Sequence, residues 1–176
     1  AYCANNPVMY FDPSGFVSLC PMKYQPGTSP DELRKIDADI IDQMDKNVGH
    51  IQQRHVGKSN EFLLNRAAKE RLDATSFSNK RTATKAIQEN IRKNADQISN
   101  WLNNPKANYP LTLETTHQYP IGYGVKTTSG VMRGKKLYPK ASKNVTYDLT
   151  SSKVFIVKDP QMPNKYKIIT AYPVID

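Results

Sequence analysis

The hydrophobic pattern of this 176-residue chain changes once, near Asn103-Asn104-Pro105. Before that point, apolar residues recur every three or four positions, which is the spacing of one helix face. After it, from Tyr109 onward, short runs rich in β-branched and aromatic residues alternate with Pro, Gly and Ser, as strands and turns do. Helices followed by strands predict an α+β fold with an antiparallel sheet.

The clearest helix start lies at Ser29-Pro30-Asp31-Glu32. Ser29 is a candidate N-cap, Pro30 occupies the first helical position, and Glu32 completes a capping box. An apolar stripe at helical spacing continues from this start to Val48, so we expect one helix over this stretch. The preceding residues 1–28 are rich in turn formers, which indicates a loop or connector ahead of a domain at 29–176.

Further helices and strands follow from the same signals. A short helix is expected at 50–56, another after a cap at Ser59, and a long one from a cap at Ser78 to Asn103. Strands are expected around 111–113 and at 122–126, 145–149, 154–158 and 166–172. The loop 159–164 has the length of a hairpin connection between the last two strands.

The charge balance favours a polyanionic partner. Lys and Arg total 25 against 16 Asp and Glu, which gives a formal net charge of +9. Nucleic acid, an anionic membrane and an acidic protein are all compatible with this excess, and so is an ordinary basic surface. One stretch is especially basic, and it is either a solvated loop or a segment that holds an RNA backbone: Lys126, Arg133, Lys135, Lys136, Lys140 and Lys143.

Metal, thiol and membrane functions are poorly supported. Cys3 and Cys20 both lie in the N-terminal segment, where they either form a disulfide or stay unpaired, and they have no zinc-ligand spacing. His50 and His55 are five residues apart, not the four that place two imidazoles on one helix face. We therefore expect no metal and no cofactor. No apolar run reaches the ~18 residues of a membrane span, so stable membrane insertion is not expected.

RNA cleavage without a metal needs a base that titrates near neutrality and donors that stabilise a more negative phosphate. Histidine supplies the first, and Arg, Lys, Thr or Tyr supplies the second. Arg66 follows His55 by eleven residues, but Gly57 interrupts the helix between them. Thr170 and Tyr172 share one strand face by the period of two. Each of these side chains is equally compatible with ordinary packing or solvation.

The opening of the chain has a specific pattern, which runs from Asn5-Asn6-Pro7-Val8 to Asp12-Pro13-Ser14-Gly15. This pattern resembles the end of the core in Rhs/YD-repeat proteins. In those proteins such a segment closes the repeat shell and a variable toxin domain follows. The resemblance implies that this chain is the C-terminal tip of a larger secreted or cell-surface protein, with residues 1–28 as the end of the core and a linker.

Three motifs follow one another along the remainder of the chain, supported by Ser76-Phe77 before a helix and Trp101-Leu102 at a helix end. The motifs are the stretch from Gly49-His50 to His55-Val56-Gly57-Lys58-Ser59, then Leu63-Leu64-Asn65-Arg66, and Tyr166-Lys167-Ile168-Ile169-Thr170-Ala171-Tyr172-Pro173. With these motifs in this order, the remainder resembles the ribonuclease-A-like domain of bacterial contact-dependent inhibition toxins.

This second resemblance implies a pancreatic-ribonuclease-like fold without disulfides and an endoribonuclease that leaves a 2′,3′-cyclic phosphate. The family's catalytic histidine, arginine, threonine and tyrosine fall on His55, Arg66, Thr170 and Tyr172. The general acid stays open, with His50 as the spare imidazole and no motif support for the third histidine, His117.

The resemblance also implies a cellular setting. The toxin would be monomeric and would act on RNA in the cytoplasm of a target cell, with tRNA as one candidate substrate. In the producing cell, a cognate acidic immunity protein would hold it inactive. The rival hypothesis is a non-catalytic basic module for RNA binding or adhesion, which explains the charge but not the conjunction of these four side chains.

Overall fold

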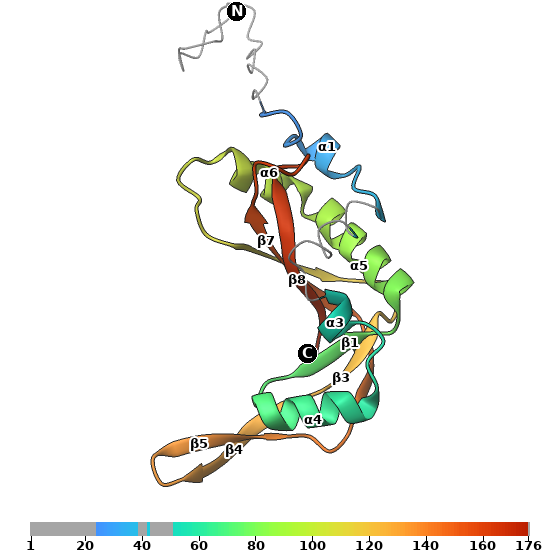
Figure 1. Ribbon diagram of the computed structural model, residues 1–176, viewed down its shortest axis with the longest axis vertical. Helices are drawn as coiled ribbons and strands as arrows, with labels where there is room; N and C mark the ends of the chain where they lie inside the picture. The colour runs from blue at the N-terminus through green and yellow to red at the C-terminus, as the bar shows by residue number, and fades with distance from the viewer. Residues whose placement is uncertain (1–23, 39–41, 43–50, 176) are drawn as a thin grey trace, which may run out of the picture.

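The computed structural model describes residues 24–38, 42 and 51–175 (Figure 1). The helices are α1 (Pro30–Leu33), α3 (Ile51–His55), α4 (Asn60–Glu70), α5 (Lys80–Lys93) and α6 (Ala95–Asn103). The strands are β1 (Ala74–Phe77), β2 (Leu111–Thr116), β3 (Gly122–Val125), β4 (Thr127–Arg133), β5 (Lys136–Ala141), β6 (Thr146–Leu149), β7 (Ser151–Lys158) and β8 (Tyr166–Val174).

The strands form three antiparallel groups. The orders are β1-β3-β6, β2-β7-β8, and the two-stranded pair β4-β5. Helices α5 and α6 lie beside the β2-β7-β8 sheet, whereas α4 lies beside β1 and β3 and the β4–β5 hairpin projects from that end of the molecule (Figure 1). Helices followed by antiparallel strands confirm the predicted α+β class.

The main core lies between α5 and the β2-β7-β8 sheet. The predicted apolar face of α5 is buried, with Ala86, Ile87 and Ile91 at most 1% exposed. It packs in one cluster with Leu113 of β2 and Ile156 of β7. Each large apolar side chain buried in this way stabilises the fold by about 1.5–3 kcal/mol. Because this core covers one face of the sheet, the opposite face of β7 and β8 points toward α3, α4 and β1.

A smaller core joins α4 to the β1-β3-β6 sheet. Leu63 and Ala67 on α4 pack against Ala74 of β1 and Val125 of β3, and all four are at most 1% exposed. The helix begins where the sequence predicts, because the Ser59 side chain accepts a hydrogen bond from the backbone N–H of Phe62. These contacts hold α4 and β1 together, and both elements carry residues of the site described below.

The first predicted helix is interrupted. The capping box at Ser29 and Glu32 is present, but α1 ends at Leu33 and residues 36 and 37 are not helical, whereas residues 38 and 42 are helical again. Side chains of α5 take the carbonyls that a continuing helix would use: Arg92 donates to the Arg34 and Ile36 oxygens. The apolar stripe is correct at Leu33 and Ile36, which are buried, although the stretch bends between them.

Three other expectations need correction. The fourth helix begins after an Asn79 cap rather than Ser78, and it is two helices that meet at Asn94. The Asn94 amide donates to the Asn90 carbonyl and to Thr115 Oγ1, which fixes the bend against β2. Strand β1 was not expected at all. Strands β4 and β5, which contain most of the basic stretch, were not expected either.

Several expectations concern residues outside the described ranges. They include Cys3, Cys20 and His50, and most of the segment 1–28, so its boundary at 28 stays a prediction. The described end of that segment contacts the domain, since Thr28 is fully buried and Gln25 and Thr28 bond to Asn103. No helix within the described residues has the length and apolar character needed to cross a bilayer.

Candidate active site

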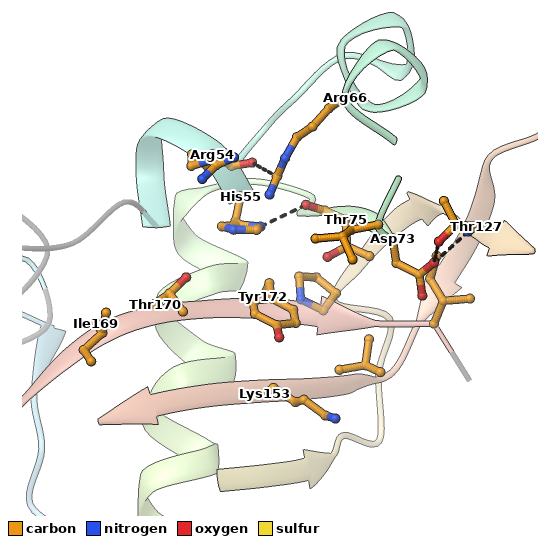
Figure 2. A pocket seen from close by; sticks show the side chains of 14 residues that line it. Arg54, His55, Arg66, Asp73, Thr75, Thr127, Lys153, Ile169, Thr170 and Tyr172 are labelled. Atoms are coloured by element: carbon orange, nitrogen blue, oxygen red, sulfur yellow. Dashed lines mark hydrogen bonds between the residues drawn. The ribbon is translucent and has the colours of Figure 1, made fainter. Parts of the chain in front are cut away.

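A cleft of about 690 Å³ lies where the two halves of the molecule meet, between α3, α4, β1 and the β7–β8 hairpin (Figure 2). All four residues that the sequence singles out line it: His55, Arg66, Thr170 and Tyr172. They come from three elements that are up to 117 positions apart in the chain (from 55 to 172). Tertiary folding therefore brings together the whole predicted set.

His55 ends α3 and is 8% exposed. Its Nδ1 lies 3.2 Å from the carbonyl oxygen of Thr75 in β1. A carbonyl can only accept a hydrogen bond, so Nδ1 carries the proton and, in the neutral ring, Nε2 carries the lone pair. The short bridge from Val56 to Phe77, with the Gly57 N–H donating to the Phe77 oxygen at 2.9 Å, holds this end of α3 against β1.

The surroundings of His55 favour its neutral form. Burial is the largest cause and the positive charge of Arg66 is the next, and together they lower its pKa from 6.5 to about 4, against the opposing hydrogen bond to Thr75. A neutral imidazole with a free Nε2 at neutral pH is a proton acceptor. The geometry therefore suits His55 to general-base chemistry.

Arg66 is positioned from two sides. Its Nε donates to Glu70 Oε2 at 3.0 Å, one helical turn along α4, and one terminal nitrogen donates to the Arg54 carbonyl at 3.1 Å. Glu70 also pairs with the Arg54 side chain. Gly57, at φ +59°, reverses the chain between α3 and α4, so the break in the helix brings Arg66 back over His55. The Arg66 side chain is only 13% exposed, which limits its freedom before any ligand binds.

Tyr172 and Thr170 present their side chains from β8. The Tyr172 ring stacks on His55, with centroids 5.2 Å apart and planes at 27°, and also on Phe155 of β7, with centroids 5.8 Å apart. Thr170 is paired with Phe155 across the hairpin. The period of two thus holds for Thr170 and Tyr172, which both line the cleft.

The structure adds residues that the sequence did not suggest. Lys153 lies opposite Tyr172 in the β7–β8 register and its Nζ is 2.8 Å from Glu114, whose hydrogen bond raises the Lys153 pKa. Asp73 and Thr127 close the other end of the cleft, where the carboxylate accepts from the Thr127 N–H and hydroxyl. The alternating pattern of β7 could have placed Lys153 on the solvent face of the strand. It could not have shown that Lys153 lies opposite Tyr172.

The third histidine is not part of this cleft. His117 Nδ1 lies 2.9 Å from Glu89, and its Nε2 lies 2.9 Å from the buried Ser152 hydroxyl. Although burial opposes it, hydrogen bonds from Lys93, His117 and Tyr119 lower the Glu89 pKa to about 2. His117 is therefore held in an internal network. Among the described residues, no group of three or more His, Cys, Asp or Glu is placed to hold a metal ion.

Comparison with known proteins bears on what this cleft does. Residues 49–173 match the family described as "Bacterial CdiA-CT RNAse A domain". The chain belongs to this family. The chain is also similar to one in a solved structure described as "Crystal structure of CdiA-CT/CdiI complex from Y. kristensenii 33638", at 34% identity and a TM-score of 0.58. That match covers 72% of this chain and 100% of the other. None of the curated proteins compared with the chain matches it.

Membership of the CdiA-CT ribonuclease family makes this chain a toxin ribonuclease domain of contact-dependent inhibition, as the sequence resemblance implied. The fold is accordingly ribonuclease-A-like, with all described helices preceding every strand except β1. The matched range runs from before α3 into the end of β8, so it contains the whole predicted catalytic set. The roles of His55, Arg66, Thr170 and Tyr172 within this family member stay predictions.

Proposed function

We propose that this domain cleaves RNA by metal-independent transphosphorylation, with His55 as the general base. The observation that carries the proposal is the hydrogen bond from His55 Nδ1 to the Thr75 carbonyl, in a cleft that also contains Arg66, Thr170 and Tyr172. It leaves Nε2 as the only ring atom able to take a proton. A ribose 2′-OH placed within hydrogen-bond reach of Nε2 gives up its proton to it as the oxygen attacks phosphorus.

The attack forms the bond from the 2′ oxygen to phosphorus and breaks the bond from phosphorus to the 5′ oxygen. The phosphorane oxygens gain negative charge, and Arg66 is pre-oriented by Glu70 to donate to them. Thr170 and Tyr172 donate hydrogen bonds to the phosphate or assist the leaving oxygen, and Lys153 adds a positive charge beside Tyr172. The leaving 5′ oxygen needs a proton, for which Tyr172 and His50 are the two candidates.

The rival function is a basic binding module without catalysis. It accounts for the +9 charge, but it gives no reason for a desolvated histidine with a low pKa beside a pre-oriented guanidinium. Perturbed titratable groups that converge in a cleft are typical of catalytic sites. The geometry therefore favours the enzyme.

The deciding experiment is incubation of the purified chain with RNA in EDTA. We expect cleavage to persist and the products to carry 2′,3′-cyclic phosphate and 5′-hydroxyl ends, because the 2′ oxygen is the nucleophile. His55→Ala should lower the rate by at least ~10²-fold with the fold intact by circular dichroism. Products with 5′-phosphate ends, or tight RNA binding with no cleavage, would reject the mechanism.

We further propose the biological setting that the sequence suggests. The domain is the toxic tip of a secreted or cell-surface protein, with residues 1–28 as the end of an Rhs/YD-repeat core and a linker, and it acts in the cytoplasm of the target cell. A producing cell contains RNA of its own and needs an inhibitor. The solved relative is a CdiA-CT/CdiI complex, which supports a cognate immunity protein for this chain as well.

A further inference from the structure

The β4–β5 hairpin concentrates the positive charge of the molecule. Residues 126–143 hold six basic side chains and no acidic one, so they carry six of the nine net charges of the chain. None of the ion pairs formed among the described residues involves the exposed Lys135, Lys136, Lys140 or Lys143. A solvated loop has no need for basic residues without any acidic residue among them.

The hairpin is an ordered two-stranded element. Arg133 pairs with Lys136, so the turn has two residues, and Gly134 supplies the φ of +63° that such tight turns require. One extra residue between Thr128 and Val131 makes a bulge in β4, which increases the twist of a strand pair. Strands β4 and β5 pair with each other and with no other strand among the described residues, and the hairpin projects from the body of the molecule (Figure 1).

The base of the hairpin is continuous with the catalytic cleft. Thr127, the first residue of β4, lines the cleft and is fixed there by Asp73, which accepts from its N–H at 2.6 Å and its hydroxyl at 2.7 Å. The cleft extends from Thr170 past Tyr172 to this point (Figure 2). A polyanion bound across His55 therefore leaves the cleft at the root of the basic hairpin.

From these observations, and resting on the proposed ribonuclease function, we propose that the β4–β5 hairpin is an arm that binds the phosphates of the RNA flanking the scissile bond. The seven residues of β4 span about 23 Å. At ~3.4 Å per nucleotide along one strand, this is about seven nucleotides beyond the cleft. Because the major groove of an A-form helix is too narrow for a ribbon to read, the arm contacts the backbone and recognises RNA of sufficient length rather than a sequence.

The test uses oligonucleotides with a single ribonucleotide in a DNA chain, so that only one bond can be cut. The flank on the 5′ side and the flank on the 3′ side are lengthened in separate series. Each substrate is made with each of the four ribonucleotides, so that a base preference at the cleavage site does not mask the effect of length. We expect KM to fall as one flank grows to about seven nucleotides and then to level off. In Lys135→Gln/Lys136→Gln, KM for the long substrate should rise about tenfold at 0.15 M salt, and the salt slope should shrink by ~1.4.

The matched control is Lys35→Gln/Lys106→Gln, which removes two exposed lysines and should leave the KM unchanged. These lysines follow α1 and α6, which lie at the end of the molecule away from the hairpin (Figure 1). Thermal unfolding of both double variants checks the fold. Binding of the all-deoxy version, which lacks the 2′-OH and cannot be cut, is followed by fluorescence anisotropy. Loss of affinity in the hairpin variant supports the arm even if no RNA is cleaved, so failure of the arm and failure of the enzyme are distinguishable.

Two results would overturn the proposal. One is a KM that is independent of both flanks or equally changed in the two double variants. The other is a hairpin variant that binds RNA normally but binds an acidic immunity protein weakly, which would make the hairpin a protein-binding surface.

Discussion

His55 combines two features that normally oppose each other. Burial against Tyr172 lowers its pKa to about 4, which weakens it as a base, while the Thr75 carbonyl fixes the tautomer that makes it available. The Arg66 that we propose to bind the phosphate also depresses this pKa. Binding of an anionic phosphate near Arg66 offsets part of that depression, because the two charges then compensate each other. We therefore expect His55 to be a stronger base when substrate is present.

We expect the pH profile to report this arrangement. The general base must be neutral, so kcat/KM should rise with pH and its acidic limb should lie near pH 4 rather than 6.5 in the free enzyme. Arg66→Ala removes a cause of the low pKa, so its limb should move to higher pH and its rate should fall by ~10²-fold or more. Arg66→Lys keeps the charge and should leave the limb in place without restoring the rate, because an ammonium lacks the planar fork of donors. A limb near 6.5 in the unmodified enzyme would contradict this account.

At the scale of elements, a bulge in β8 decides which residues face the cleft. Ile156 pairs with Ile168 and Phe155 pairs with Thr170, so Ile169 is an extra residue. Ile168 consequently faces the core while Thr170 faces the cleft, and strict alternation would have put both on one side. The bulge also brings Tyr172 opposite Lys153, which places the lysine in the site.

A second element-level constraint is the close approach of β3 to β1. A Cβ on Gly122 would lie 2.2 Å from the Ser76 carbonyl oxygen and 2.7 Å from a side-chain carbon of Pro173. The adjacent residue of β1 is Thr75, whose carbonyl orients His55. Only glycine allows the two strands to lie this close together, so Gly122 helps to hold the Thr75 carbonyl in place.

Gly122→Ala should therefore lower the free energy of unfolding by about 1–3 kcal/mol, as overpacking does, and should also reduce kcat/KM by shifting Thr75. Gly134→Asn is the matched control for stability, because its Cβ meets nothing within 4 Å and asparagine tolerates the positive φ. Urea unfolding followed by circular dichroism measures the stability of both variants. If Gly122→Ala is as stable as Gly134→Asn and as active as the unmodified enzyme, the close approach does not constrain the site.

At the scale of the whole molecule, basic side chains lie both in the cleft and on the hairpin beyond it. Arg54, Arg66 and Lys153 line the cleft, and the lysines of the β4–β5 hairpin extend from its end. Such a field attracts polyanions over distances longer than a hydrogen bond, and it equally attracts an acidic protein. An inhibitor of this domain can therefore use the same field as the substrate.

We predict that the cognate immunity protein is acidic and that its association rate falls steeply with salt, because exposed charges are screened beyond ~8 Å at physiological ionic strength. Stopped-flow measurement from low to high salt tests this, with dissociation measured separately as a quantity that should change less. A rate that does not depend on salt, or a producing cell that tolerates the active toxin with no bound inhibitor, would refute it.

The sequence by itself determined the α+β class, the capping of α1 and α4, the apolar face of α5 and the hairpin of the last two strands. These features depend on residues close together in the chain, whose periodicity and turn chemistry act locally. The family resemblance added the four site residues, and the structure brings all four to one cleft. Their chemical roles stay predictions.

Only the tertiary structure decided the rest. α1 ends early because Arg92 of a distant helix donates hydrogen bonds to the carbonyl oxygens that follow it. Arg66 reaches His55 because the chain reverses at Gly57. Lys153 joins the site because a bulge shifts the register, and β1 exists because β3 pairs with it. Each of these outcomes depends on a partner far away in the sequence, and local periodicity carries no information about such partners.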